Sequence, residues 1–595
     1  MKAETYKALL KDLQKLQKDL VASQIAAVRR DVAQSARMAR LHTEAEVGGR
    51  VDDFVATAAR KSTVLFLLRT VFVRVLEDLG ILGLKRIRGD WGFAAFREVV
   101  PALDHRAYFA FVFRDLAIDF PALFAPGDDE LPLPDEDGCV DVWELWHHPN
   151  RDGEHYVWNG DGFDSRFLGD LYQDLDKDIR KRYALLQTPR FVEEYILDHT
   201  LTPALAEFDP VALREKGETF RLIDPTCGSG HFLIGAFHRL ADYWRDRHGL
   251  AEWEASERAL ESVWGCDINP HAVDIAAFRL LLEVVARTGV KDLDRLAALK
   301  FNLRTMDSLI PWERAAKQGE LFPAKDRLDA YATLEQRGAN AAFLGRDFHV
   351  VVGNPPYITP KEVKKDQDYR AFWPTACHMK YALSAPFCER LFVLGTTGSF
   401  IGQITSNSFA KRHFGARLVN EILPGFDLQL IADTSGLIIP GHGTPTIILI
   451  GRNRNPALGT IRVVLAKRGD SRKHANPEQG PVWRELLSLS ATSGEGSYLS
   501  GAVHARSLYA QHPWSLGGGP ARDILDTIAG AATGTLKQPG VRGGLKTYLQ
   551  QDDVFTTYPP GLSFQSACTT VNIVGSPPGL VGGSRPSRDG LEVNA

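Results

Sequence analysis

The sequence is poor in cysteine, and it has neither a long hydrophobic run nor a phosphate-binding loop of the GxxxxGK[ST] type. Its six cysteines are scattered, without a Cys-x-x-Cys pair, which argues against a zinc site and against a disulfide framework. The most apolar run, residues 64–75, contains Arg69 and Arg74 and is shorter than the roughly 20 apolar residues of a membrane span. We therefore expect a buried helix there. Because the N-terminus also lacks a signal peptide, the sequence favours a cytoplasmic protein without a membrane partner that does not hydrolyse ATP by itself.

The chain also has no excess of positive charge. The formal net charge is -4, so phosphate groups could be contacted only through local basic patches. One polar helical stretch could touch phosphates or form a solvated face; it carries Arg29, Arg30, Arg37 and Arg40. Hydrophobic residues make up 44% of the chain, which is typical of a folded globular protein. Because ordinary cores stop growing at roughly 250 to 300 residues, we expect about two to four domains.

Residues 1–165 are expected to form a helical N-terminal domain with an acidic loop insertion. Hydrophobic residues recur there at three- and four-residue steps, as in a bundle helix or short coiled coil: Tyr6, Leu9, Leu13, Leu16 and Leu20. A second helical block is expected at 51–84. Residues 126–165, rich in Pro, Gly and Asp, are expected to be a surface connection.

From about residue 167 helices alternate with short apolar runs, which predicts βαβ units and a doubly wound α/β fold. The expected strands are 221–224, 263–267, 348–352, 398–404 and 446–450. The α/β domain is expected to cover residues 166–455, and residues 456–530 would begin a C-terminal region. The tail, 531–595, is expected to be disordered because its last part is rich in Gly, Ser and Pro without an apolar period.

Acidic and small residues stand at three strand ends, two of them belonging to the strands named above. Asp224 comes before a turn in which Gly228 and Gly230 would let the backbone pass close to a ligand. Asp267 follows the next strand and could accept ribose hydroxyls, and Asp307 follows another and could receive an amino group. A structural βα turn, helix caps or loop residues would explain each feature alone. Their order along the chain favours a nucleotide-like cofactor.

The segment Asn354-Pro355-Pro356-Tyr357 follows an apolar strand and is the most informative motif. Two prolines stiffen the loop. An aromatic amine is a poor nucleophile, and two acceptors, the Asn354 side-chain oxygen and the Pro355 carbonyl, would stabilise the positive charge that develops on it during methyl transfer. Tyr357 could stack on a base swung out of a duplex. An ordinary Asn-Pro turn is the alternative.

Asp224-Pro-Thr-Cys-Gly-Ser-Gly-His-Phe together with Asn354-Pro-Pro-Tyr resembles the N6-adenine DNA methyltransferases of the gamma motif order. This resemblance implies a Rossmann-like class I fold, double-stranded DNA as partner and S-adenosylmethionine as cofactor, without a metal. The cofactor residues that it implies are Thr188, Asp224, Cys227, Gly228, Gly230, Asp267 and Asp307, with Thr188 near the methionine carboxylate. The segments 406–412 and 443–446 resemble later motifs around the target base.

The stretch 167–174 and the helical N-terminus are similar, more specifically, to the large BREX, or phage growth limitation, methylases of type 2 systems. This implies a role in phage defence with other BREX proteins as possible partners. Those methylases are longer and carry a target-recognition region after the catalytic domain, so the resemblance predicts a truncated or frame-shifted product. Basic residues near the candidate site could contact DNA: Lys361, Lys364, Lys411 and Arg412.

Three other functions stay open. A fused restriction and modification enzyme would need a Glu-x-Lys nuclease site before the methylase, but Glu362-Val363-Lys364 follows the catalytic loop. The same loop could act on a protein glutamine or on an RNA base, although such enzymes are usually compact. The chain could also be an inactive DNA-binding subunit of a defence complex.

Overall fold

The computed structural model describes the chain in segments: residues 3–44, 50–89, 91–127, 130–149, 155–158, 164–175, 188–318, 328, 331–437, 444–469 and 476–518. All of them belong to one compact unit of the chain. The tail that was expected to be disordered, 531–595, lies outside the described residues.

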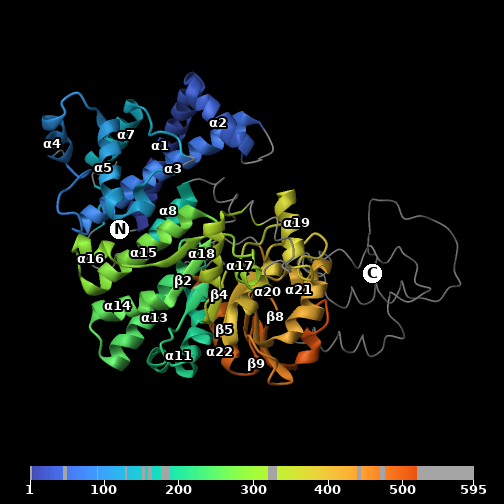
Figure 1. Ribbon diagram of the computed structural model, residues 1–595. Helices are drawn as coiled ribbons and strands as arrows, with labels where there is room; N and C mark the ends of the chain where they lie inside the picture. Colours follow the sequence, from blue (N-terminus) through green and yellow to red (C-terminus); the bar gives the residue numbers. More distant parts are fainter. Residues whose placement is uncertain are drawn as a thin grey trace, which may run out of the picture. The chain divides into compact units, whose positions relative to one another are not determined.

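The N-terminal region is helical, as its hydrophobic spacing predicts (Figure 1). Leu9 and Leu13 of the first helix are fully buried. Every residue from Val64 to Val75 is buried in one long helix, which confirms the prediction for the apolar run. The helices are α1 (Ala3–Arg30), α2 (Val32–Glu44), α3 (Val51–Asp78), α4 (Trp91–Val99), α5 (His105–Asp119), α6 (Pro121–Phe124), α7 (Glu136–His147) and α8 (Arg166–Leu175).

The prediction of a surface connection at 126–165 is wrong, because α7 lies within this range and packs into the core. Trp143 and Trp146 lie one turn apart on α7 and are both buried. Gly138, which reads as a helix breaker in the sequence, allows α7 to approach α1 closely: a Cβ there would lie 2.5 Å from Leu20 Cδ2. The Pro and Asp residues on either side of α7 favoured the prediction of a loop, although the segment between them forms a short amphipathic helix.

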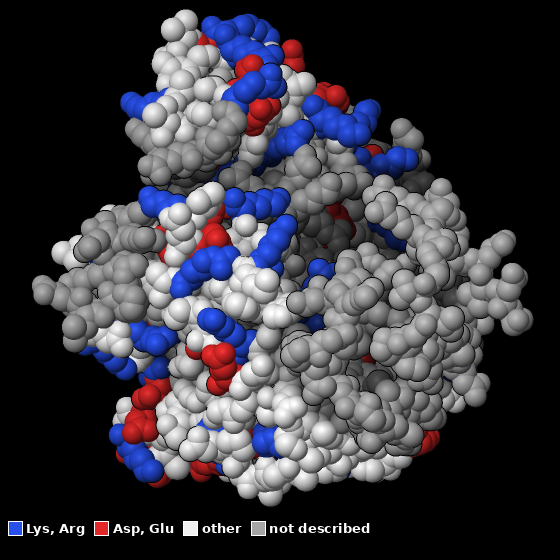
Figure 2. Space-filling model, turned by 90° about the vertical axis from the view of Figure 1, so that its right-hand side faces the viewer, with Lys and Arg blue, Asp and Glu red and all other residues white. Residues whose placement is uncertain are grey.

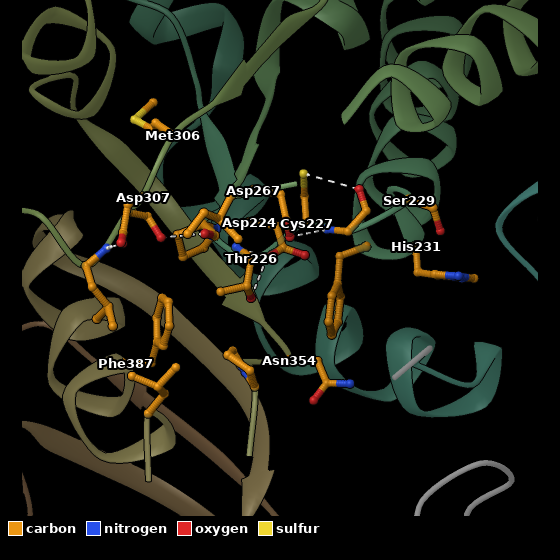
Figure 3. A pocket seen from close by; sticks show the side chains of 18 of the residues that line it. Asp224, Thr226, Cys227, Ser229, His231, Asp267, Met306, Asp307, Asn354 and Phe387 are labelled. Carbon is orange, nitrogen blue, oxygen red and sulfur yellow. Dashed lines mark hydrogen bonds between the residues drawn. The ribbon is translucent and has the colours of Figure 1, made fainter. Parts of the chain in front are cut away.

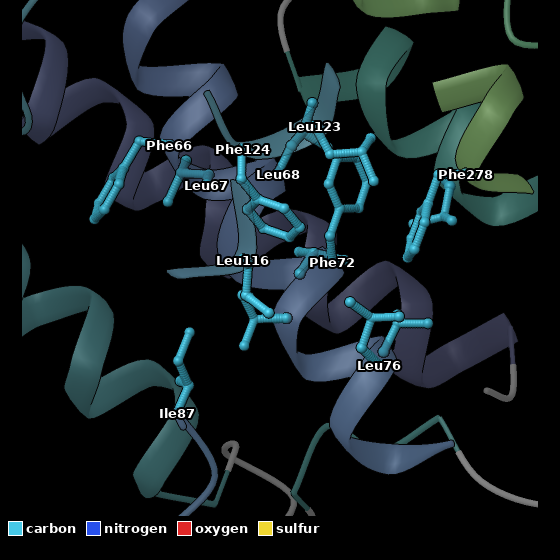
Figure 4. Close-up of a cluster of buried hydrophobic side chains, with 14 of the residues drawn as sticks. Phe66, Leu67, Leu68, Phe72, Leu76, Ile87, Leu116, Leu123, Phe124 and Phe278 are labelled. Atoms are coloured by element: carbon cyan, nitrogen blue, oxygen red, sulfur yellow. The ribbon is translucent and has the colours of Figure 1, made fainter. Parts of the chain in front are cut away.

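The helical region shares its hydrophobic core with the α/β part of the chain (Figure 4). Phe72 of α3 meets Phe278 of α15 (Pro270–Thr288) with ring centroids 4.8 Å apart. Leu168 and Leu171 of α8 belong to the same cluster. The expected boundary at residue 165 therefore runs through one continuous core.

The centre of the molecule is a single sheet in the order β3-β2-β1-β4-β5-β7-β6-β8-β10-β9. Strands β1 to β5 run parallel to their neighbours within this group, and β7 is antiparallel to both β5 and β6. The predicted α/β fold is confirmed, and each expected strand is present. The bounds are β1 (Leu222–Asp224), β2 (Val263–Asp267), β3 (Asn302–Thr305), β4 (Phe348–Gly353), β5 (Gly395–Ser406), β6 (Asp427–Asp433), β7 (Thr446–Arg452), β8 (Thr460–Ala466), β9 (Gly494–Glu495) and β10 (Leu499–Ala505).

Helices cover both faces of the sheet. Alternate strand residues point to opposite sides, and the apolar side chains on each side pack against a different set of helices. Val350 and Val352 of β4 pack with α10, α13 and α22, whereas Val351 packs with the residues of α19 and α20. These and the remaining helices are α10 (Arg190–His199), α11 (Leu201–Glu207), α12 (Pro210–Glu215), α13 (His231–His248), α14 (Glu252–Ser262), α16 (Leu293–Ala297), α17 (Trp312–Gln318), α18 (Leu334–Leu344), α19 (Val363–Phe372), α20 (Ser384–Leu394), α21 (Ser408–Lys411) and α22 (Pro481–Ala491). In the ranges that the structure describes, no helix has the length and apolarity to cross a bilayer.

Residues beyond 455 continue this sheet. β8 pairs parallel with β6, and β10 pairs antiparallel with β8. Trp483 and Leu486 of α22 are buried in the same cluster as Val464 of β8. The expected division at residue 455 therefore cuts through one sheet, so the described residues after it do not form a separate folding unit.

Candidate active site

A pocket that is open to solvent lies at the carboxyl ends of β1, β2, β3 and β4. Ligands bind at this edge of parallel sheets, because the loops that follow the strands meet there. Figure 3 shows Asp224, Asp267 and Asp307 along one side of the pocket and Asn354 and Phe387 across from them. The pocket thus gathers residues that lie far apart in the sequence.

The turn after β1 lines the pocket. Asp224 accepts hydrogen bonds from Thr226 N (2.9 Å) and Thr226 Oγ1 (3.2 Å). Gly228 has a φ of 50°, a left-handed conformation that favours glycine. Gly230 has a φ of 86° at the N-cap of α13, and a Cβ there would lie 3.0 Å from Ala276 Cβ. The backbone conformation of the turn therefore favours glycine at both positions, and the packing on α15 leaves little room for a Cβ at Gly230.

Asp267, at the end of β2, is held by two backbone amides. Its Oδ2 accepts a hydrogen bond from Gly228 N (3.0 Å) and its Oδ1 accepts one from Asn269 N (2.8 Å). Ile268, the next residue, lines the pocket with 46% of its surface exposed. An acceptor is thus placed beside an apolar surface on which a flat ring could rest.

Asp307 follows β3 and is contacted by α19. Its Oδ2 accepts a hydrogen bond from Tyr369 OH (2.5 Å) and its Oδ1 accepts one from Leu309 N (3.0 Å). Ser308 Oγ donates to Pro225 O (2.6 Å), which ties this loop to the turn after β1. The carboxylate that was expected to receive an amino group therefore already has two donors, although its oxygens have further lone pairs.

Burial dominates the electrostatics of these carboxyls. It raises the pKa of Asp224 to about 8, since the two hydrogen bonds from Thr226 do not offset the loss of water and the charge of Asp267. Burial also raises the pKa of Asp267 and of Asp307. Buried carboxylates are costly unless positive charge or hydrogen-bond donors offset the loss of water, so this side of the pocket suits a ligand with positive charge and several N–H or O–H donors.

The loop after β4 brings an amide to the same pocket. Asn354 Oδ1 accepts a hydrogen bond from Tyr357 OH (2.7 Å), and Asn354 Nδ2 donates one to Thr188 Oγ1 (3.2 Å). A Cβ at Gly353 would lie 3.1 Å from Thr226 Oγ1, so this loop runs directly against the turn after β1. The amide is fixed at both of its ends next to the three carboxyls.

Comparison with protein families gives one match along the centre of the chain. The Eco57I restriction-modification methylase family matches residues 261–437, a range that contains Asp267, Asp307 and Asn354.

Similarity to two relatives extends this result. The adenine-specific methyltransferase PglX of Streptomyces coelicolor is 35% identical over 93% of this chain and 49% of its own length. The chain carries an Eco57I-type methylase domain and is PglX-like. A putative type II restriction enzyme and methyltransferase of Methanocaldococcus jannaschii is 32% identical over 19% of this chain and 10% of its own length. The chain thus spans about half the length of PglX.

A solved structure has a similar fold. The complex of DrdV with DNA, determined by electron cryomicroscopy, matches 86% of this chain and 46% of its own chain with a TM-score of 0.50 and 14% identity. At this identity the likeness concerns the fold alone, and it agrees with the α/β architecture of the PglX-like chain.

Most of the predicted cofactor and catalytic residues of this PglX-like chain line one pocket: Thr188, Asp224, Cys227, Gly228, Asp267, Asp307, Asn354 and Pro356. Gly230, Pro355 and Tyr357 do not line the pocket, but each is a sequence neighbour of a residue that does. Burial raises the pKa of the Cys227 thiol, so Cys227 contributes a neutral, compact wall.

The basic residues predicted to contact DNA lie outside the pocket lining. Lys361 and Lys364 are exposed at the start of α19, and Arg412 is exposed after α21. Lys411 is partly buried, and its charge opposes the rise in pKa that burial gives to Asp433. The structure leaves their role as DNA contacts a prediction.

Sequence reasoning missed several lining residues: Gln173, His231, Ile268, Tyr369 and Phe387. His231 directly follows Gly230, and burial together with Arg279 and Arg166 lowers its pKa, so its ring is neutral. Only Ile268 carries a sequence signal, as an apolar residue directly after an acidic strand end. Among the described residues, no group of three or more His, Cys, Asp or Glu side chains is arranged to hold a metal ion.

Proposed function

We propose that this chain transfers a methyl group from S-adenosylmethionine to the exocyclic N6 of an adenine in double-stranded DNA. One observation carries the proposal: Asn354 lines the same pocket as Asp224, Asp267 and Asp307. The similarity to an adenine-specific methyltransferase and to a restriction-modification methylase family supports it. The same resemblance supports a cytoplasmic role in phage defence of the BREX type, with other BREX proteins as partners.

The residues of the pocket fit the proposed cofactor. S-adenosylmethionine has a sulfonium, an ammonium group, two ribose hydroxyls and an amino group, which are cations and donors. Three buried carboxyls with raised pKa values are complementary to such groups. Ile268 and Phe387 provide apolar surface for the adenine ring. Asp224 would hold the ammonium end, Asp267 the ribose and Asp307 the amino group.

The catalytic step depends on how the chain holds the target amine. When bound, the cofactor supplies a methyl carbon activated by the sulfonium. Asn354 Oδ1, which accepts the bond from Tyr357 OH, is an amide oxygen with two acceptor lone pairs, and the Pro355 carbonyl provides a second acceptor. Both would accept hydrogen bonds from the amine and stabilise the positive charge that N6 gains as it bonds to the methyl carbon and the bond from that carbon to sulfur breaks. N6 would then lose one proton to solvent. The ring of Tyr357 would stack on the extrahelical base.

DNA would approach the side of the molecule that bears α19, α20 and α21. Figure 2 shows Lys and Arg side chains spread over the described part of this face, with fewer Asp and Glu among them. Because the net charge of the chain is -4, such a local excess of positive charge is what phosphate contacts require. Lys361, Lys364, Lys411 and Arg412 are the proposed contacts.

The proposal is tested by tritium transfer from labelled S-adenosylmethionine to duplex DNA, RNA and protein. We expect incorporation into DNA, recovered as N6-methyladenine, and a fall of at least about a hundredfold for Asn354→Ala, because both acceptor geometry and charge stabilisation are lost. Asn455→Ala, which changes an exposed asparagine, serves as the matched control and should keep the wild-type rate. Incorporation only into protein or RNA, or an active Asn354→Ala variant, would overturn the proposal.

A further inference from the structure

Helix α8 of the N-terminal region reaches the candidate active site, although nothing in its composition suggests a catalytic element. Its Gln173 lines the pocket. Two more of its residues, Gly169 and Tyr172, are buried against the turns that follow β1 and β2. The same C-terminal turn of α8 is also held by α1, because Gln14 Nε2 donates a hydrogen bond to Asp174 O (2.7 Å). The helix therefore connects the N-terminal bundle with the pocket.

Tyr172 acts on the turn after β2 through a chain of hydrogen bonds. Its hydroxyl accepts one from Asn269 Nδ2 (2.9 Å), and both side chains are buried. Asn269 is the N-cap of α15, and its backbone amide donates to Asp267 Oδ1 (2.8 Å). The orientation of the Asp267 carboxylate thus depends on a tyrosine from another region of the chain.

Gly169 acts on the turn after β1. A Cβ at this position would lie 2.5 Å from Ser229 Oγ and 3.2 Å from Arg279 Nη1. Arg279 is fully buried and donates through Nη1 to Ser229 O (2.5 Å). Ser229 is therefore held between α8 and α15, in the middle of the glycine turn. Any larger residue at position 169 would have to displace the side chain of Ser229 for α8 to lie this close to the turn.

We propose that Tyr172 and Gly169 are positioning residues for the methyl donor. They hold Asp267 and the glycine turn in the geometry that binds the donor, so that donor affinity depends on the docking of the N-terminal helices. This inference rests on the proposed function, since it concerns the same pocket. It adds that α8, outside the α/β sheet, is part of the donor site.

Calorimetry with S-adenosylmethionine tests Tyr172→Phe in the full-length chain. Loss of the hydroxyl leaves Asn269 Nδ2 buried without this acceptor, and we expect the Kd for the donor to rise about tenfold. The KM for the donor should rise equally, while kcat at saturating donor and the KM for DNA stay within about twofold of wild type. The matched control is Tyr108→Phe, which removes a buried hydroxyl that donates to Arg86 O (2.7 Å) elsewhere in the N-terminal core. It should lower the Tm to a similar extent and leave the Kd unchanged.

A second pair of variants probes the other contact. Gly169→Ala should weaken donor binding, and adding Ser229→Ala, which removes the closest contact of the new Cβ, should restore part of the affinity. Wild-type affinity in both Tyr172→Phe and Gly169→Ala, or an equal loss in Tyr108→Phe, would overturn the inference. A wild-type chain that binds the donor but does not methylate DNA would contradict the proposed function and still allow this comparison. A wild-type chain that does not bind the donor would overturn both.

Discussion

Thr188 and Asn354 are joined by a hydrogen bond from Asn354 Nδ2 to Thr188 Oγ1 (3.2 Å), although 166 residues separate them in the sequence. The sequence resemblance placed Thr188 near the methionine carboxylate of the cofactor. The structure adds a second task, because this bond and the one from Tyr357 OH fix both ends of the Asn354 amide. With its Nδ2 held by Thr188, the amide oxygen keeps its direction.

Thr188→Val is therefore expected to slow methyl transfer. Valine keeps the shape of threonine but removes the acceptor, so the amide can turn and present its nitrogen to the amine. We expect kcat to fall about tenfold, which corresponds to one lost hydrogen bond, with a smaller change in the Kd for the methyl donor. Single-turnover tritium transfer to DNA measures the step. Thr188→Ser is the matched control and should retain most of the rate; an equal loss in both variants would mean that the hydroxyl is not what matters.

Tyr357 has two separable contributions, its hydroxyl and its ring. Tyr357→Phe keeps the ring and removes the hydroxyl with its bond to Asn354 Oδ1, and we expect a fall of a few-fold in kcat. Tyr357→Ala also removes the surface on which the base would stack, and because stacking contributes about 1–3 kcal/mol per base, the rate should fall about tenfold or more beyond that of the phenylalanine variant. The two rates are compared on one duplex substrate. Similar rates for Phe and Ala would exclude a stacking role.

The strand ends could be predicted because their signal is local. β1, β2 and β4 are short apolar runs followed by Asp224, Asp267 and Gly353, and the carboxyl ends of parallel strands meet at one edge. That is sufficient to bring the acidic residues and Asn354 to one site.

The contacts of these residues could not be predicted, because they depend on where distant helices lie. Tyr369 belongs to a polar helix, and nothing near it in the sequence indicates a bond to Asp307. The closeness of Gly169 to Ser229 depends on the docking of α8. The composition of residues 126–165 also gave a wrong prediction at α7. Glycine in a sequence suggests the end of a helix, but Gly138 lies within α7 and allows its close contact with α1.

Donor binding should depend on pH through Asp224. Because burial raises its pKa to about 8, the ligand-free carboxyl carries a proton at pH 6 to 7. A cationic donor favours the ionised form, so binding releases a proton, and affinity should rise with pH by up to about tenfold per unit until about pH 8 and then level off.

Calorimetry in buffers of different ionisation enthalpy measures the proton release. In Asp224→Asn this contribution should vanish and overall affinity should fall, while titration of the donor's own amine affects both proteins equally. Asp19→Asn, an exposed position on α1, should keep the wild-type pH profile. Parallel profiles for wild type and Asp224→Asn would show that another group titrates.

The proposed DNA contacts at the start of α19 can be tested through the salt dependence of DNA binding. Lys361 and Lys364 are exposed and three residues apart. If each neutralises one phosphate, replacing both by alanine should weaken DNA binding on any sequence and reduce the slope of log K against log salt by about 0.9 for each lost contact. The matched control is Lys15→Ala with Lys18→Ala, a pair of the same charge and spacing exposed on α1. Fluorescence anisotropy at several salt concentrations measures both pairs. An unchanged slope in the α19 pair, or the same loss in the α1 pair, would mean that α19 does not lie along the DNA, whereas a smaller slope only in the α19 pair would place the duplex over the end of the sheet where Asn354 lies.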